Sequence, residues 1–554
     1  MDFCTSEASI ELAAYMCNPY VTDLTSPVED GSRTSAQQWR LSTSPTCSSS
    51  SSAFGAAGPL RPGSQRGRRL AHCPYPNPVL GNTLDFIRNR RRFFDWYADL
   101  LRAAPSGAIE AWGPFGSGRA VTAASPADVD HLLRAGFAGY VKGARFREAT
   151  ADLIGDGLFA ADGRLWSLQR KLASHAFSSR SLRRFADGVL AVHLRRGLLP
   201  SLDAAAAAGR AVDLQAALRR FGFGTICHVA FGVEVADGDG DPRQEALFAA
   251  FDAALEISFR RALTPATWVR RLTKLLDVGR SRRLREAVGV IDGYAMSVVE
   301  SKEARRRKGG LDDGDADLLS RFMAAMDGED GGELGAMFPT SAAKRRFLRD
   351  VVVTFVLAGK DTTSSALTWF FWLLAANPRC ERRAREEAAT DSGGGVKGMH
   401  YLHAAITEAM RLYPPVPFNG RIAARDDELP SSATVRAGWH ANYSAYGMGR
   451  MRALWGEDCM EFVPERWLGD GGEFVPADAA RYPVFHTGPR VCLGKEMAYV
   501  QMKTVAAAVL RRFRVEVLAP VASMEAPPAY EMTATMKMKD GLWVRLCRRE
   551  ESAE

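Results

Sequence analysis

The sequence predicts a mainly α-helical protein with small β-sheets, because helical apolar patterns dominate the chain as far as residue 420. The longest apolar run covers residues 347–376, and the alanine run 204–208 also favours helix. Extended stretches are few and short, at Ala108–Trp112, Ala120–Ala123 and Trp543–Leu546. With 554 residues, of which 46% are hydrophobic, the chain is long enough to bury a large core.

The N-terminal part of the chain differs in composition from the rest. Residues 1–72 contain a serine run at 48–52 and no apolar run of membrane-spanning length. We therefore expect residues 1–72 to form a disordered or atypical extension, and residues 73–548 to form a single domain after a proline-rich hinge. Glycine- and aspartate-rich loops are expected at 237–241 and 309–315.

Charge and cysteine usage exclude some function classes. The net charge is +8, with arginine clusters at 88–92, 270–271, 280–285 and 305–308. No nucleic-acid recognition motif accompanies these clusters, so we expect an acidic protein partner and no nucleic acid, while any single cluster is most often a solvated face. Nine cysteines without regular spacing favour reduced thiols over a disulfide framework, and no Cys-x-x-Cys pair predicts a zinc site.

The most specific pattern is Phe-x-x-Gly-x-Arg-x-Cys-x-Gly, formed by Phe485, Gly488, Arg490, Cys492 and Gly494. Apolar residues recur at helical spacing downstream, so a helix should begin shortly after the cysteine. A helix N-terminus and a nearby arginine favour a thiolate, and glycines allow close approach. A lone cysteine is most often a small buried hydrophobe, but a thiolate on a glycine-lined loop is how cysteine holds haem iron.

The long apolar run carries polar residues at its centre, from Lys360 to Ser365. Charges at bilayer depth are costly, so we expect a buried helix and not a membrane span. Asp361 beside Thr362 suits a proton relay, in which the hydroxyl binds dioxygen or water and the acid passes protons inward. The alternative is a local helix kink without chemistry, since threonine hydroxyls bond back to helix carbonyls.

Two further pairs have helical spacing. Glu408 and Arg411 lie on one helix face at i, i+3, although such pairs are common on solvated surfaces. Trp166 and Arg170, at i, i+4, place an indole N–H beside a guanidinium, and two donors side by side suit a carboxylate. The alternative for the second pair is an aromatic ring packed under an arginine stem.

These four motifs, in this order over residues 166–494, resemble the cytochrome P450 superfamily. The resemblance implies the cytochrome P450 fold, with haem (heme b) between the long central helix and the cysteine-loop helix and with Cys492 as the iron ligand. Trp166, Arg170, Arg490 and Arg421 would bind haem propionates, and Phe485, Gly488 and Gly494 would shape the loop. Glu408, Arg411 and Arg466 would brace that loop, and Asp361 with Thr362 would carry oxygen activation.

Finer resemblance points to a plant clan. The runs 161–166, 357–372 and 488–496 resemble plant fatty-acid hydroxylases, and 347–350 with 447–450 resembles the branch of fatty-acid ω-hydroxylases and jasmonoyl-isoleucine hydroxylases. This implies ω-hydroxylation of fatty acids with O2 and with electrons from NADPH through cytochrome P450 reductase. The alternatives are hydroxylation of the jasmonoyl-isoleucine conjugate, a haem-thiolate isomerase, and an inactive haem binder.

The resemblance also implies a substrate channel and a location. The expected lining is apolar, and each member is equally an ordinary core candidate: Phe146, Phe159, Val353, Leu357, Ala358, Val416 and Phe418. Relatives of this kind sit on the cytosolic face of the endoplasmic reticulum membrane, held by an N-terminal apolar helix that residues 1–72 do not show. A plastid location is the alternative, because residues 31–84 are rich in serine and arginine and carry no acid.

Overall fold

The computed structural model describes residues 71–73, 76–116, 118–235, 241–263, 278–308, 317–327, 332–390, 395–518 and 527–549. Of the expected extension 1–72, only the last two residues are described, as strand β1 (Ala71–His72). The loops expected at 237–241 and 309–315 and the arginine cluster at 270–271 lie outside the described residues, apart from residue 241.

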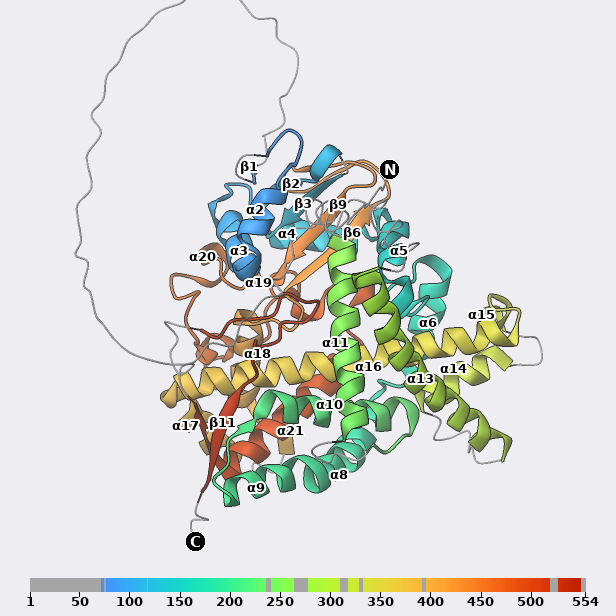
Figure 1. The fold of residues 1–554 in the computed structure, drawn as a ribbon. Coiled ribbons are helices and arrows are strands. Elements are labelled where there is room, and N and C mark those ends of the chain that lie inside the picture. The colour runs from blue at the N-terminus through green and yellow to red at the C-terminus, as the bar shows by residue number, and fades with distance from the viewer. Residues whose placement is uncertain are drawn as a thin grey trace, which may run out of the picture.

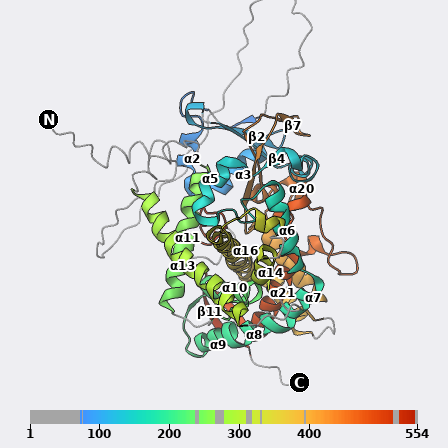
Figure 2. The same ribbon diagram turned by 90° about the vertical axis from the view of Figure 1, so that its right-hand side faces the viewer.

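Helix α16 (Ser341–Ala376) runs through the middle of the molecule (Figure 1). The Thr340 hydroxyl accepts a hydrogen bond from the N–H of Ala343 at 3.1 Å and so caps its N-terminus. Figure 2 looks nearly along α16 and shows other helices all around it. The prediction of a long buried helix is therefore confirmed. Within the described ranges, no helix combines the length and apolarity that crossing a membrane requires.

Several of the described helices pack directly on α16, and others complete the helical part of the fold. The packed helices include α5 (Gly143–Ile154), α10 (Leu214–Phe231), α13 (Arg280–Arg307), α14 (Leu318–Asp327), α17 (Pro378–Ala389), α18 (His400–Leu412) and α21 (Lys495–Arg512). The remaining longer helices are α3 (Phe93–Ala103), α6 (Gly163–His175), α9 (Leu199–Ala207) and α11 (Pro242–Leu263). The alanine run lies in α9, as predicted, apart from its last residue.

Short helices connect these elements. They are α2 (Thr83–Arg88), α4 (Pro126–Asp130), α7 (Ser179–Arg184), α8 (Ala191–His193), α15 (Glu333–Ala336), α19 (Ala445–Met448) and α20 (Arg452–Trp455). Single turns at η3 (His131–Ala135), η9 (Pro464–Trp467), η10 (Pro483–Phe485) and η11 (Gly488–Arg490) shape the segments around the cysteine.

Three small sheets lie at the periphery. The largest has the order β1–β2–β3–β9–β6–β4, with β2 (Ala108–Trp112), β3 (Arg119–Ala123), β9 (His440–Ser444), β6 (Phe418–Ala423) and β4 (Tyr140–Val141). A second has the order β10 (Phe513–Val517), β11 (Trp543–Arg548), β5 (Val212–Asp213), and β7 (Asp427–Glu428) pairs with β8 (Thr434–Val435). The three predicted extended stretches are strands β2, β3 and β11, so this part of the prediction is confirmed.

The core is divided by the polar centre of α16. Residues 347–357 pack in one apolar cluster with α10, α11, α13 and α14. Residues 366–374 pack in the other with α18 and α21, and the Trp369 ring stacks on Tyr413 with a centroid distance of 4.0 Å. Residues 358–365 belong to neither cluster. The polar stretch of α16 therefore lies where the two apolar clusters meet. Polar side chains at this position interrupt neither cluster.

Candidate functional site

The cysteine loop folds back against the helix that follows it. Cys492 lies three residues before α21, which confirms the prediction that a helix begins shortly after it. Its backbone N–H donates to the carbonyl of Phe485 at 2.8 Å, and the Phe485 ring lies 5.3 Å from the Tyr499 ring of α21. The hydrogen bond closes the loop, and the ring contact fixes the loop, with its cysteine, against α21.

Glycine at position 488 is demanded by the fold. Gly488 has a φ of +68°, and a Cβ there would lie 2.1 Å from the carbonyl oxygen of Leu133 in η3. Position 494 is different, because a Cβ on Gly494 would meet only ordinary van der Waals distances, 3.6 Å to Phe177 and 4.0 Å to Cys492 Sγ. Of the two positions, only 488 requires glycine, because of its positive φ and its close approach to the Leu133 backbone.

The charge state of Cys492 departs from the expectation for a helix N-terminus. The Cys492 side chain keeps access to solvent, although many protein atoms surround it. These atoms displace water from around the thiol, and this desolvation raises its pKa above the ordinary value. The N–H of Gly494 and the charges of Arg170 and Lys495 lower it again without compensating fully. The loop by itself therefore does not favour the thiolate, and deprotonation would come with metal binding.

Cationic side chains from four segments converge beside the cysteine loop. Arg490 donates to Asp162 Oδ1 and to the carbonyl of Ala161, both at 2.8 Å, and its guanidinium lies 4.6 Å from the centre of the Trp166 ring. Arg170 of α6 donates to the carbonyl of Val491. The predicted residues Trp166, Arg170 and Arg490 are therefore brought together, with the arginine of the loop lying over the indole.

Burial makes this cluster electrostatically costly. Burial and, to a smaller extent, neighbouring positive charges lower the pKa of Arg490 to about 10 and that of His486 to about 3. The pKa of Lys142 is lowered well below its usual value for the same reasons. Arg421 on β6 is only 4% exposed, its pKa is lowered by burial, and its Nε has no acceptor in the described part of the chain.

This cluster contains one carboxylate and several cations. Asp162 is the acid whose charge acts on Lys142, Arg421 and Arg490. A buried guanidinium nitrogen without an acceptor and an excess of positive charge both fit an anionic group with more than one carboxylate. Haem, with two propionates and an iron that takes a cysteine ligand, has that chemistry. Lys142, Asp162 and His486 were not predicted as site residues, although Asp162 and His486 lie within the runs 161–166 and 485–494 that the sequence analysis singled out.

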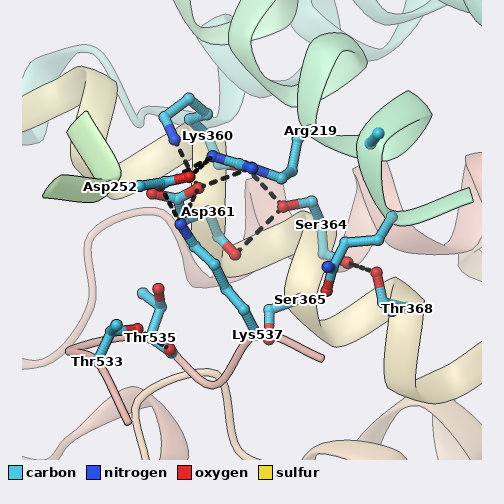
Figure 3. Close-up of polar contacts among 12 residues, drawn as sticks. Arg219, Asp252, Lys360, Asp361, Ser364, Ser365, Thr368, Thr533, Thr535 and Lys537 are labelled. Atoms are coloured by element: carbon cyan, nitrogen blue, oxygen red, sulfur yellow. Dashed lines mark hydrogen bonds and ion pairs between the residues drawn. The ribbon is translucent and has the colours of Figure 1, made fainter. Parts of the chain in front are cut away.

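Asp361 lies in a buried ion network (Figure 3). Its Oδ1 is 2.6 Å from Lys360 Nζ, 3.4 Å from Arg219 Nε and 3.6 Å from Lys537 Nζ. Arg219 of α10 and Lys537 of the C-terminal turn also pair with Asp252 of α11. Burial raises the pKa of Asp361, but the three cations outweigh it and hold the pKa below the usual range.

Thr362 has partners of its own. Its hydroxyl donates to the carbonyl of Ala358 at 2.7 Å, as predicted for a hydroxyl inside a helix. The Asp361 carboxylate is held by the network, and its Oδ2 is buried without a hydrogen-bond partner in the described ranges. The structure therefore gives the acid and the hydroxyl separate environments. Arg219, Asp252 and Lys537 could not be found from local spacing.

Glu408 is the centre of a second buried network. The Glu408 and Arg411 side chains are both 0% exposed, and Arg411 donates to both carboxylate oxygens at 2.7 Å. Arg466 donates to Oε1 at 2.9 Å and Trp467 to Oε2 at 2.8 Å. Arg411 also donates to the carbonyls of residues 449, 459 and 461. The three predicted support residues therefore meet, and they join α18 to the chain that precedes the cysteine loop.

Residues 72–536 match the family model described as Cytochrome P450. The chain belongs to the cytochrome P450 family. It is 40% identical over 487 residues to cytochrome P450 CYP94D108 of Paris polyphylla, covering 85% of this chain and 92% of the relative. It is 39% identical to cytochrome P450 94B1 of Arabidopsis thaliana (86% and 92% covered) and to cytochrome P450 94A2 of Vicia sativa (86% and 91%). These relatives confirm the resemblance to the plant clan, and the chain is a cytochrome P450 monooxygenase.

The expected channel residues of this cytochrome P450 have different environments. Val353 and Leu357 are buried in α16. Phe418 packs at its ring edge against Phe93 and Tyr97, with centroid distances of 6.2 and 5.5 Å. The other members are accessible to different degrees, since Phe146, Val416 and Ala358 are half-buried and Phe159 is 41% exposed. Their role in a channel stays a prediction.

Gly488→Ala should prevent haem incorporation into the cytochrome P450, because the new Cβ would collide with the Leu133 carbonyl and displace the loop. The reduced carbon-monoxide difference spectrum measures this. Gly472→Ala is the matched control, since Gly472 also has positive φ (+81°) but no atom within 4 Å of its added Cβ. A normal spectrum for Gly488→Ala would contradict the collision.

Glu408→Ala should lower the free energy of unfolding by about 3–5 kcal/mol, because it leaves the buried Arg411 without its partner. Chemical denaturation followed by tryptophan fluorescence measures the change. Glu457→Ala is the control, since it removes an ion pair with Arg452 in which the Glu457 side chain is 84% exposed and the Arg452 side chain 72%. It should change the free energy of unfolding by less than about 1 kcal/mol. Equal losses in the two variants would show that burial is not the cause.

Proposed function

We propose that this cytochrome P450 hydroxylates the terminal carbon of fatty acids, with O2 and with electrons that NADPH supplies through cytochrome P450 reductase. The observation that carries the proposal is similarity over most of the chain to members of the 94 group, in the clan that includes fatty-acid ω-hydroxylases. The proposed location is the cytosolic face of the endoplasmic reticulum membrane, with a plastid as the alternative. The proposed electron donor is acidic, because the chain carries a net charge of +8.

The residues of the site have separate tasks in this reaction. Haem bound through a thiolate supplies the oxygen chemistry, since the thiolate donates electron density that favours O–O cleavage. Cys492 would hold the iron, and the cations around Arg421 would hold the propionates. The Thr362 hydroxyl would hydrogen-bond dioxygen or water, and Asp361 would supply protons through its unbonded oxygen. The apolar N-terminal half of α16 would exclude water from the substrate.

Terminal hydroxylation requires steric control, because internal methylenes are more reactive than the terminal methyl. A narrow apolar channel that presents only the chain end gives that control. Jasmonoyl-isoleucine is the second candidate substrate, because residues 347–350 and 447–450 resemble the branch that contains both activities. A haem-thiolate isomerase is disfavoured by the intact pair of Asp361 and Thr362, which that reaction does not need.

Microsomes that contain the full chain and a cytochrome P450 reductase should convert lauric and oleic acids to products hydroxylated at the terminal carbon. Product position is measured by mass spectrometry after incubation with NADPH, and jasmonoyl-isoleucine is offered in parallel. Hydroxylation of the hormone conjugate alone would replace the fatty-acid proposal with the second candidate. An intact spectrum without NADPH oxidation on any substrate would favour an inactive haem binder.

Cys492→Ser should abolish the thiolate spectrum of the reduced carbon-monoxide complex, because an alcohol does not provide the soft anionic ligand. Cys547→Ser is the matched control, since that cysteine lies on β11, apart from the loop, and should leave the spectrum unchanged. A thiolate spectrum that survives in Cys492→Ser would refute the assignment of the iron ligand.

Thr362→Ala should keep the thiolate spectrum but uncouple NADPH consumption from product, with peroxide formed instead, because the hydroxyl at the oxygen site is removed. The ratio of product to NADPH measures the coupling. Thr363→Ala is the matched control, since its hydroxyl bonds back to the Gly359 carbonyl in the same way, at 3.1 Å, on another face of α16. Unchanged coupling in Thr362→Ala would exclude a role for the hydroxyl in proton delivery.

A further inference from the structure

The run 347–350, which resembles a branch of the family, ends in two adjacent buried charges with no part in the site above. Arg349 and Asp350 are only 6% and 4% exposed, and Arg349 Nη1 donates to Asp350 Oδ1 at 3.0 Å. They lie near the N-terminal end of α16, on which α5 and α13 pack. Burying both charges is costly, so their other partners indicate what they hold.

Arg349 holds the C-terminal end of α5. Its Nη1 donates to the carbonyl of Leu153 at 2.6 Å and its Nη2 to that of Asp152 at 3.3 Å. Its Nε donates to Asp292 of α13 at 2.5 Å. The last carbonyls of a helix lack partners within the helix and carry the negative end of its dipole, so a buried guanidinium suits them. Arg349 thereby joins α5 and α13 to α16.

Asp350 holds the residues that follow α5. Its Oδ2 accepts a hydrogen bond from the N–H of Asp156 at 3.0 Å. Gly155 has a φ of +47°, and a Cβ there would lie 2.0 Å from Asp350 Oδ2. A Cβ on Gly157 would lie 2.1 Å from Thr354 Oγ1, one turn along α16. The backbone of 155–157 therefore lies directly against α16, an approach that only glycine allows.

Packing alone does not hold this connection in place. Cavities of about 970 and 440 Å³ adjoin the C-terminal end of α5, and Ala151 and Asp350 line both. Apolar contact is therefore incomplete around the end of α5, and the polar contacts of Arg349 and Asp350 replace it.

The connection between α5 and α6 leads from these charges to the haem side of the molecule. Gln169 of α6 donates to the carbonyl of Asp156 at 2.8 Å. Asp162, at the far end, pairs with Arg490 of the cysteine loop. Phe159, an expected channel residue, lies between the two ends. A shift of the connection at Asp156 would therefore move both a predicted substrate contact and a partner of the cation cluster.

We propose that Arg349 and Asp350 are positioning residues that hold the α5–α6 connection and so determine where along an aliphatic chain oxygen is inserted. They act through residues 155–162 and touch neither haem nor substrate. The proposal rests on the proposed hydroxylation, and loss of either charge would let the connection shift and the substrate bind in more than one register.

Hydrogen–deuterium exchange of the full-length holoenzyme tests the contact without turnover. Asp350→Asn should speed exchange of the peptide 152–162 by about ten-fold, because the Asp156 N–H loses its charged acceptor. Arg345→Gln is the matched control, because Arg345 lies one turn earlier on α16, pairs with Glu303 and is 46% exposed. It should leave exchange unchanged. Equal protection of 152–162 in wild type and Asp350→Asn would overturn the proposal.

Product analysis tests the consequence. Asp350→Asn should keep the thiolate spectrum, raise KM several-fold with little change in kcat, and convert a terminal product into a mixture with internal positions. Gly155→Ala disturbs the same contact from the side of the connection, so it should also raise KM and give internal products. In the double variant these changes should be no larger than in either single variant, because both substitutions break one contact. Gly209→Ala, with a φ of +61° and open space around its added Cβ, controls for backbone strain. An unchanged product, or a lost spectrum in Asp350→Asn, would overturn the positioning role.

The two proposals fail differently. If wild type hydroxylates no fatty acid, the proposed function is wrong, while the exchange experiment still decides whether Asp350 holds the connection. If wild type is active and Asp350→Asn gives the same product at the same KM, the proposed function stands and the positioning role falls.

Discussion

Each ionised carboxylate in the core of this protein has to be matched by buried donors, and the fold is organised around three of them. Glu408 accepts hydrogen bonds from Arg411, Arg466 and Trp467 and so joins α18 to the segment that precedes the cysteine loop. Asp361 gathers cations from α10, α16 and the C-terminal turn, and Asp350 holds the α5–α6 connection. An unmatched buried charge costs several kcal/mol, so each carboxylate binds together segments that are distant in sequence.

The region beside the cysteine loop follows the opposite rule. Around Arg421 and Arg490 the cations outnumber the single carboxylate of Asp162, and one buried guanidinium nitrogen has no acceptor. Elsewhere in the described core the networks are close to balanced, as Asp361 and Asp252 with Lys360, Arg219 and Lys537 show. The excess of positive charge around Arg421 and Arg490 fits an anionic group, which agrees with membership of a haem-binding family.

Much of the architecture could be predicted because its signals are local. The long apolar run predicted α16, the helical spacing of apolar residues predicted α21, and short extended stretches predicted β2, β3 and β11. The partners of Asp361 could not be predicted, because Arg219, Asp252 and Lys537 come from distant segments and each resembles a surface charge in its own neighbourhood. The thiol of Cys492 shows the same limit, since the local helix N-terminus favours a thiolate but burial raises its pKa.

The sequence by itself determined the family and the mainly helical class, because both signals lie in short stretches of the chain: five specified positions around Cys492, and apolar residues at helical spacing. The tertiary structure alone decided which groups surround each site residue and how strongly burial and neighbouring charges act on it. Desolvation and Coulomb energy depend on groups brought together from hundreds of residues away, and local spacing carries no information about them. Gly155 and Gly488 are the clearest cases, because their need for glycine appears only when Asp350 and Leu133 are packed against them.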